Sequence, residues 1–259
     1  MNAETLLMFV LGVNRAYLYA HPERELTSEE EARYDEVIAQ RANGVPSQYI
    51  TGHQEFWGLD FVVTPAVLIP RPETEHLVET ALELAKGIER PHIVDVGTGS
   101  GCIALALANE LRSAEVWAVD LSAQALEIAR ANAARLQLER RVCFLQSNVL
   151  EALSDRRDFD FVVSNPPYVG HDEADKVQRS VFEFEPRMAV FAGESGLDVI
   201  RPLVEQAHLA LKPDGWLAME IGYSMRDAVV GLLSPTLWEE PSIVPDLQGI
   251  PRVIAARRK

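Results

Sequence analysis

A strand, a glycine-rich turn and a helix follow one another in the middle of this chain, and no other feature limits its fold as strongly. Residues 92–96 (HIVDV) are apolar and strand-forming, residues 97–101 (GTGSG) form the turn, and a helical stretch rich in alanine and leucine begins at Cys102. The next apolar run ends in an acidic residue, Asp120, 23 positions after Gly97. Parallel strands joined through a helix need a crossover connection, so the pattern predicts an open α/β sheet.

The same alternation continues towards the C-terminus. We expect strands at 115–119, 141–146, 159–163, 216–221 and 252–256, and helices at 122–136, 197–211 and 225–233. Strands that alternate with helices of this length form a mostly parallel sheet with helices on both faces. The predicted fold class is therefore α/β with a Rossmann-like sheet, and such sheets bind ligands beyond the carboxyl ends of their strands.

The first part of the chain has a different pattern, with helices and then a region rich in glycine and proline. The expected elements are a helix with residues 6–13 on its buried side, a helix opened by a capping box at Thr27 and Glu30, a hairpin of residues 55–57 and 61–63 about Gly58, and a helix from Pro72 to about Lys86. Residues 1–76 are thus expected to form a helical N-terminal domain with a hairpin connector, and residues 77–259 the α/β domain.

Charge and cysteine content disfavour several classes of protein. The chain has 24 lysine and arginine residues against 39 aspartate and glutamate residues, a formal net charge of −15, which disfavours general nucleic-acid binding. Cys102 and Cys143 are far apart and the six histidines form no close pair, so we expect neither a disulfide framework nor a metal site. The apolar run at 6–13 is too short to span a bilayer and follows Glu4, so we expect a cytoplasmic protein.

The glycine turn and Asp120 together are typical of a site for an adenosine-containing cofactor. Glycines let the backbone approach a ligand closely, and a carboxylate at the end of the next strand can accept hydrogen bonds from ribose hydroxyls. The fingerprint for NAD needs a small residue at position 102, where this chain has Cys. The shorter turn favours a ligand without a pyrophosphate, and S-adenosylmethionine fits that description. A tight turn that binds nothing is the alternative, and the position of Asp120 argues against it.

A second motif, Asn165-Pro166-Pro167-Tyr168, follows the expected strand at 159–163, so it should lie at the same edge of the sheet as the glycine turn. A residue before proline is held extended, and a proline carbonyl has no N–H beside it to compete. The side-chain oxygen of Asn165 and the carbonyl of Pro166 can accept hydrogen bonds from the two N–H groups of a planar NH2 group, and Tyr168 can stack on it. The motif therefore predicts methyl transfer to an amide or aromatic amine, and a turn without a catalytic role is the alternative.

Taken together, these residues resemble the bacterial peptide chain release factor N5-glutamine methyltransferases, the HemK/PrmC family. Residues 41–52, 55–58, 67–75, 95–101 and 165–168 carry the resemblance, which runs from about residue 40 to the C-terminus. It implies methylation by S-adenosylmethionine of the Gln side-chain amide in the Gly-Gly-Gln loop of class I release factors, with S-adenosylhomocysteine as product. It also implies that the helical N-terminal domain helps to dock the protein substrate, with no membrane partner and no direct nucleic-acid partner.

Carried over to this chain, the resemblance implies cofactor contacts by Gly97, Thr98, Gly99, Ser100, Gly101, Asp120, Asn148, Val149 and Asn165. The implied catalytic residues are Asn165, Pro166 and Tyr168, and with Pro167 they also hold the substrate glutamine. One position departs from the family, which usually has Asp where this chain has Asn148, at the contact with the adenine amino group. An Asn oxygen can still accept a hydrogen bond, so we expect weaker or reoriented adenine binding.

Two other functions compete with this one. Adenine N6-methyltransferases that act on DNA or RNA hold a flipped base with the same kind of Asn/Asp-Pro-Pro-aromatic motif. Charge disfavours them here, because residues 1–76 carry 5 basic and 12 acidic residues and residues 77–259 carry 19 and 27. A cofactor-binding adaptor without catalytic activity is the other alternative, and it would have no need of the Asn-Pro-Pro-Tyr motif.

Overall fold

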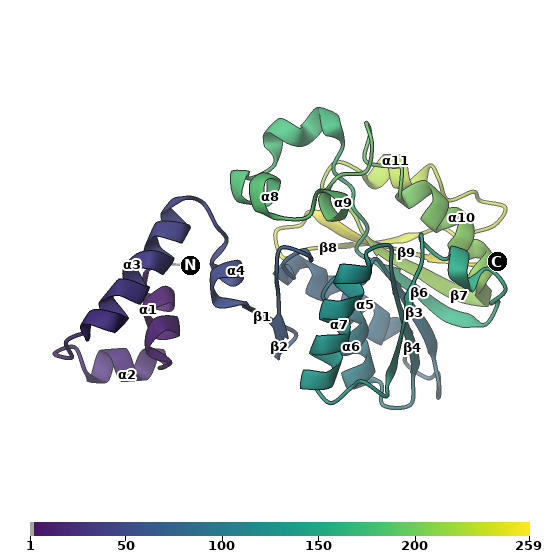
Figure 1. Ribbon diagram of the computed structural model, residues 1–259. Helices are drawn as coiled ribbons and strands as arrows, with labels where there is room; N and C mark the ends of the chain where they lie inside the picture. The colour runs from purple at the N-terminus through teal and green to yellow at the C-terminus, as the bar shows by residue number, and fades with distance from the viewer. Residues whose placement is uncertain (1–2) are drawn as a thin grey trace.

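The structure is a computed structural model that describes residues 3–259, and its centre is a seven-stranded sheet (Figure 1). The strands of this sheet are β3 (His92–Val96), β4 (Glu115–Asp120), β5 (Val142–Gln146), β6 (Phe159–Ser164), β7 (Leu211–Glu220), β8 (Ser242–Pro245) and β9 (Pro251–Arg257). They lie in the order β5-β4-β3-β6-β7-β9-β8, and β3 to β7 are all parallel. The predicted α/β sheet is therefore confirmed.

One edge of the sheet is antiparallel. β9 pairs antiparallel with both β7 and β8, and β8 was not expected from the sequence. It is four residues long and ends in a proline, so it lacks the apolar alternation that marks a strand. β7 begins at Leu211, five residues before the expected start, and its early part is the polar stretch Lys212-Pro213-Asp214.

Helices cover both faces of the sheet. α5 (Glu75–Leu84), α6 (Cys102–Glu110) and α7 (Ala123–Arg135) pack on one face, and α10 (Ile200–Ala210) and α11 (Arg226–Val230) pack on the other (Figure 1). Successive strand residues point to opposite faces, so Ile93 belongs to one hydrophobic core and Val94 to the other. Burial on both faces explains why these strands read as continuous apolar runs.

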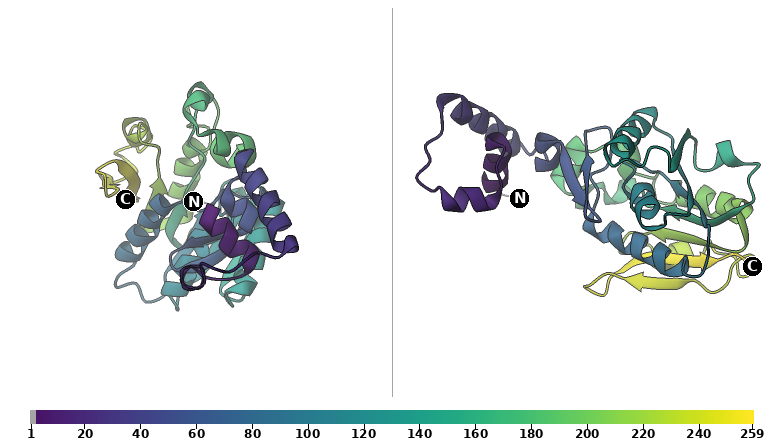
Figure 2. Two further views of the ribbon diagram at one scale, coloured as in Figure 1. Left: turned by 90° about the vertical axis from the view of Figure 1, so that its left-hand side faces the viewer. Right: turned by 90° about the horizontal axis from the view of Figure 1, so that it is seen from below.

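The N-terminal helices lie to one side of the sheet and are joined to it through a short hairpin (Figures 1 and 2). These elements are α1 (Ala3–Leu11), α2 (Arg15–Ala20), α3 (Ser28–Ala42), α4 (Ser47–Thr51), β1 (His53–Phe56) and β2 (Leu59–Val62). The capping box of Thr27 and Glu30 is present at the start of α3. Leu6, Val10 and Val37 form a small separate core between α1 and α3. Helices α2 and α4, of six and five residues, were not expected, because one or two turns carry too few apolar repeats to recognise.

The expected hairpin is present as β1–β2, but Trp57, expected in its first strand, lies in the turn, and Val63 lies beyond its second strand. A buried asparagine attaches the hairpin to the α/β part. Trp57 and Gly58 make its two-residue turn, both with positive φ, as the twist of a hairpin favours. Asn132 of α7 is fully buried, and its Oδ1 accepts a hydrogen bond from the backbone N–H of Val62 at 2.8 Å. Its Nδ2 donates to the carbonyls of Val62 (3.0 Å) and Ser100 (2.9 Å). One side chain therefore joins the hairpin edge to the glycine turn.

Short helical segments complete the fold and were largely missed at the sequence level. They are η1 (Pro72–Thr74), η2 (Glu151–Leu153), η3 (His171–Lys176), α8 (Arg179–Phe184) and α9 (Arg187–Val190). The helix expected from Pro72 begins as the 3-10 turn η1 and continues as α5, so the domain boundary expected after residue 76 falls inside that helix and stays a prediction. Within residues 3–259, no helix is long and apolar enough to cross a membrane.

Candidate functional site

The two motifs lie at the carboxyl ends of neighbouring strands. The chain runs from β3 outward to β4 and β5 and then returns to β6 on the other side of β3, and such a reversal opens a crevice at the strand ends. Gly97 follows β3 and Asn165 follows β6. The carbonyl oxygen of Asn165 is 4.0 Å from the place that a Cβ on Gly97 would occupy. The glycine turn and the Asn-Pro-Pro-Tyr motif are therefore side by side at one edge of the sheet, as expected from their places after two of its strands.

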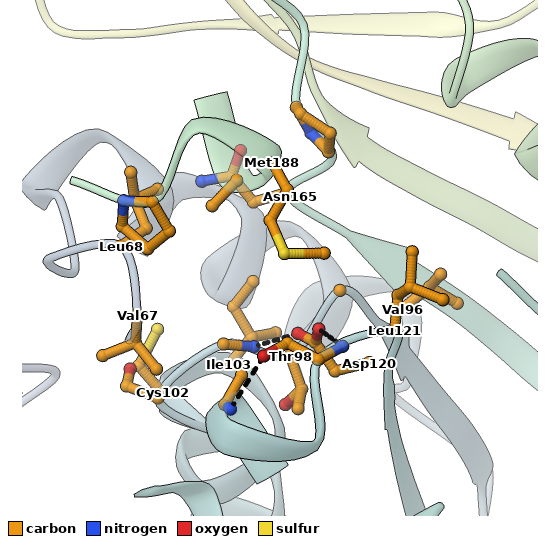
Figure 3. Close-up of a pocket in the computed structure, with 18 of the residues that line it drawn as sticks. Val67, Leu68, Val96, Thr98, Cys102, Ile103, Asp120, Leu121, Asn165 and Met188 are labelled. Carbon is orange, nitrogen blue, oxygen red and sulfur yellow. Dashed lines mark hydrogen bonds between the residues drawn. The ribbon is translucent and has the colours of Figure 1, made fainter. Parts of the chain in front are cut away.

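A cavity of about 300 Å³ opens between these motifs. Thr98 and Asp120 lie on one side of it, and Asn165 and Met188 lie on the other (Figure 3). The expected cofactor residues that line it are Gly97, Thr98, Gly99, Ser100, Asp120, Val149 and Asn165. Much of the remaining lining is apolar, including Val67, Ile103 and Leu121. The cavity therefore combines a polar turn with apolar walls, as a site for a nucleoside with a neutral base requires.

Two glycines of the turn, Gly99 and Gly101, have different structural roles. Gly99 has φ of +55°, and a Cβ there would meet no atom within 4 Å, so its backbone faces open space in the cavity. Gly101 does not line the cavity. Its φ is +84°, and a Cβ there would be 3.2 Å from the Cβ of Ala129 in α7. Gly99 thus leaves room for a ligand, whereas Gly101 lets α6 and α7 pack closely.

Asp120 carries the negative charge of the cavity. Its Oδ2 accepts a hydrogen bond from the backbone N–H of Gly99 at 2.9 Å, and its Oδ1 accepts one from the N–H of Ser122 at 2.8 Å (Figure 3). Burial raises the pKa of this carboxyl, and the backbone N–H groups oppose the shift. A carboxylate has about four acceptor sites, so roughly two remain for a ligand. This count fits the two hydroxyls of a ribose.

Asp95 supports the turn from below and does not line the cavity. Its Oδ2 accepts hydrogen bonds from the hydroxyl of Thr98 at 2.6 Å and from the N–H of Ala104 at 3.2 Å. Complete burial raises the pKa of Asp95 to about 7, against the effect of these two donors. The residue therefore fastens the glycine turn to the first turn of α6.

Asn148 does not line this cavity, although its neighbours Ser147 and Val149 do. The side chain is exposed, and its Nδ2 donates to Oε1 of Glu151 at 2.8 Å. This bond leaves Oδ1 of Asn148 as the acceptor for the expected contact with an adenine amino group, which stays a prediction. Val149 has a φ of +51°, which turns the backbone at this point.

The Asn-Pro-Pro-Tyr motif is joined to two residues, Thr74 and Glu220, for which the sequence predicted no role. Nδ2 of Asn165 donates to Oγ1 of Thr74 at 3.0 Å, and the Thr74 hydroxyl donates to Oε2 of Glu220 at 2.6 Å. The hydroxyl of Tyr168 also donates to Glu220, to Oε1 at 3.3 Å. Thr74 and Glu220 are both about 2% exposed. Glu220 ends strand β7, so the reasoning that selected Asp120 at the end of β4 could have found it.

A second cavity, of about 380 Å³, lies on the other side of Asn165. Asn165, Pro166 and Tyr168 line it, whereas Pro167 lines the first cavity. Its other polar lining residues are Arg71, Glu73, Gln178, Glu220 and Arg252. Asn165 is thus shared by both cavities and can touch a ligand in either one.

An ion pair holds the connector against the segment between β6 and α10. Arg71 donates to Glu185, whose side chain is 1% exposed, and the N–H of Ile69 donates to the same carboxylate at 3.2 Å. Met188, three residues beyond Glu185, lines the first cavity. This pair therefore fixes the position of the α9 segment, which forms one wall of both cavities. Neither α9 nor the pairing was foreseen, because the two partners are 114 residues apart.

The donor set of the first cavity fits S-adenosylmethionine. Asp120 has acceptor sites free for the ribose, Gly99 leaves space for the ligand beside the turn, and the apolar walls suit an adenine and a thioether chain. Among residues 3–259, no group of three or more His, Cys, Asp or Glu side chains is placed to hold a metal ion.

Two solved structures show the same fold. The chain superimposes on the catalytic domain of hMettl16 with a TM-score of 0.62 at 17% identity, over 78% of this chain and 76% of that one. It matches TrmN from Thermus thermophilus with a TM-score of 0.53 at 20% identity, over 99% and 78%. A family model described as the methyltransferase small domain matches residues 73–188. Fold and site together define an S-adenosylmethionine-dependent methyltransferase.

Closer relatives narrow this class. A family model described as the PrmC N-terminal domain matches residues 1–52. The release factor glutamine methyltransferase of Koribacter versatilis is 58% identical over 258 residues, which cover 100% of this chain and 91% of the relative. The enzyme of the same name from Geobacter sulfurreducens is 43% identical, over 99% and 89%. The chain belongs to the release factor glutamine methyltransferase family.

Proposed function

We propose that this protein transfers a methyl group from S-adenosylmethionine to the side-chain amide nitrogen (N5) of the glutamine in the Gly-Gly-Gln loop of class I peptide chain release factors. Relatives at 58% and 43% identity carry the name release factor glutamine methyltransferase. Such a substrate takes part in translation, so the proposal assigns the protein to the cytoplasm. It requires no contact with a membrane or a nucleic acid.

The observation that carries the proposal is the position of Asn165 between the two cavities. Because Nδ2 of Asn165 donates to Thr74, its Oδ1 is the atom left to accept a hydrogen bond. A glutamine side chain in the second cavity could donate one N–H to Oδ1 and the other to the carbonyl of Pro166. Its nitrogen would then face the first cavity, where the methyl donor binds.

Two acceptors around one amide NH2 explain how such a weak nucleophile can react. The nitrogen lone pair of an amide is delocalised, and acceptors on both N–H groups favour electron density on the nitrogen as the new bond forms. S-adenosylmethionine supplies a methyl group on a sulfonium, so that the N–C bond forms as the C–S bond breaks and sulfur keeps the electron pair. The extra proton leaves the nitrogen to water. Tyr168 can stack against the planar amide from the wall of the second cavity.

The helical part, within residues 1–76, is proposed to dock the protein substrate. It reaches the α/β part near α8, where the Cε2 atom of Phe184 is 3.4 Å from the place of a Cβ on Gly44. Glu31 and Asp35 are exposed on one side of α3. Reversing both charges with Glu31→Lys and Asp35→Lys should raise KM for a complete release factor and leave kcat unchanged. KM for a short Gly-Gly-Gln peptide should not change, and an equal effect on both substrates would contradict docking through α3.

The direct test offers labelled S-adenosylmethionine with three acceptors in separate reactions: a class I release factor, the same factor with its Gly-Gly-Gln glutamine replaced by alanine, and duplex DNA with RNA. Label is expected in the first protein alone, and mass spectrometry should locate the methyl group on that glutamine. Labelled nucleic acid together with unlabelled release factor would overturn the proposal in favour of an adenine methyltransferase.

A further inference from the structure

An asparagine amide can sit in its pocket in two ways that have nearly the same shape. In one, the NH2 group faces Thr74 and the oxygen is free; in the other, the two are exchanged. Only the first presents an acceptor to a substrate amide, and the second would present a donor. The activity proposed above therefore depends on something that holds Asn165 in the first orientation.

The hydrogen bonds beneath Asn165 run in one direction. A carboxylate accepts hydrogen bonds and cannot donate them, so the single hydroxyl proton of Thr74 is directed to Glu220 at 2.6 Å. The Thr74 oxygen can then only accept from Asn165, which must turn its NH2 group towards it, at 3.0 Å. The hydroxyl of Tyr168 donates a hydrogen bond to the other carboxylate oxygen of Glu220. The charge of one buried carboxylate thus sets the direction of all three bonds.

We propose that Thr74 and Glu220 are positioning residues that fix the orientation of the Asn165 amide and so make the acceptor cavity selective for an NH2 group. This inference rests on the proposed function. Thr74 lines the first cavity and Glu220 the second, but their role here is to orient Asn165, which alone of the three accepts the hydrogen bond from the substrate amide. Thr74 is held for this task on η1, at the start of α5, while Glu220 reaches it from the end of β7.

Protonation of Glu220 should undo the arrangement. Burial raises the pKa of Glu220, the hydroxyls of Thr74 and Tyr168 and the guanidinium of Arg252 oppose the shift, and Glu73 adds to it. A protonated Glu220 could donate to Thr74, which could then donate to the oxygen of Asn165 and reverse the chain. At saturating cofactor, kcat should therefore fall as the pH falls through the pKa of Glu220. Glu220→Gln should lower kcat at neutral pH and remove this acid limb.

The main test compares three threonine variants in the complete protein. Thr74→Val keeps the shape but cannot accept a hydrogen bond, Thr74→Ser keeps the hydroxyl, and Thr80→Val makes the same change six residues away on α5, where the hydroxyl donates to the carbonyl of His76. We expect Thr74→Val to lower kcat roughly 10- to 100-fold, while KM for the release factor and Kd for S-adenosylmethionine change less than about threefold. Thr74→Ser and Thr80→Val should stay near wild-type kcat. Wild-type kcat in Thr74→Val would overturn the inference.

A spectroscopic readout keeps the test independent of turnover and separates the inference from the proposed function. In a 15N-labelled protein, the side-chain NH2 signals of Asn165 are assigned by their loss in Asn165→Asp. Thr74→Val and Glu220→Gln should both shift these signals, and Thr80→Val should not. Unshifted signals in both variants would refute the inference even if the enzyme is active. A wild-type protein that labels no release factor would refute the proposed function, while the shifts would still decide the orientation of Asn165.

Discussion

Replacing Asp120 by alanine tests the assignment of the first cavity. The side chain stands at the end of β4, and two of its acceptor sites are used by the N–H groups of Gly99 and Ser122. Alanine removes the remaining acceptor sites that we assign to the ribose hydroxyls. It also releases two N–H groups at the rim of an open cavity, where water can replace the lost acceptor.

The size of the effect follows from these contacts. A hydrogen bond to a charged acceptor contributes about 1.5–3 kcal/mol, and the desolvated carboxylate already bears part of the cost of burial. We therefore expect S-adenosylmethionine binding to weaken by about 1.5–3 kcal/mol, roughly 10- to 150-fold in Kd. Asp120→Asn should fall within the same range, because the amide keeps one acceptor oxygen but turns a donor towards either Gly99 or Ser122.

Calorimetric titration with S-adenosylmethionine measures this change directly. Asp60→Ala is the matched control, because Asp60 lies on β2, lines neither cavity and pairs with Arg135. The control should bind the cofactor with wild-type Kd. Melting curves without ligand separate a loss of cofactor contacts from a loss of folded protein.

The pH dependence adds a second readout. Ribose hydroxyls that donate to Asp120 stabilise its ionised form, so cofactor affinity should decline as the pH falls through the raised pKa of Asp120. Asp120→Ala should lack this decline. Wild-type affinity in Asp120→Ala, or an identical pH dependence in both proteins, would show that the ribose does not bind here.

Three further substitutions probe other parts of the site. Asn165→Ala should lower kcat more than about 100-fold and leave cofactor Kd within about threefold, since it removes a contact to the acceptor amide; unchanged turnover would exclude its role. Burial raises the pKa of Asp95 to about 7, so the folded protein binds more protons than the unfolded chain between about pH 4 and 7. The free energy of unfolding should therefore fall as the pH rises through that window. Asp95→Asn should not show this fall. Asn132→Leu leaves backbone groups of Val62 and Ser100 unpaired. It should lower the free energy of unfolding, measured by urea titration, by about 2–5 kcal/mol. A loss below about 1 kcal/mol would mean that water replaces the amide.

The parts of the site that the sequence predicted are those set by a strand and the residues directly after it. Gly97 and Asp120 follow or end apolar runs, and parallel strand ends meet at one edge of a sheet, so local pattern and sheet topology suffice to bring them together. The same holds for Asn165 after β6. Their roles in binding and catalysis stay predictions for the experiments above.

Contacts between distant segments were beyond the reach of these local patterns. Thr74 and Glu220 are 146 residues apart, and Arg71 and Glu185 are 114 residues apart. Each pair depends on how η1 and the α9 segment pack across the sheet, and neither element has an apolar repeat of its own. The role of a buried polar residue such as Asn132 is equally hard to predict from the sequence, because it depends on which backbone groups the side chain contacts after folding.

The arrangement of the strand ends divides the work between two sets of residues. β3 and β4 place the glycine turn and Asp120 around the first cavity, whereas β6 and β7 place Asn165 and Glu220 beside the second. Changes at β4 should therefore appear in cofactor Kd, and changes at the end of β7 should appear in kcat and in the choice of acceptor. Asn165 lines both cavities, together with Leu68, Arg71 and Ala189. Because its backbone lies beside Gly97 and its side chain is held by Thr74, one rigid residue sets the position of the acceptor nitrogen relative to the cofactor turn.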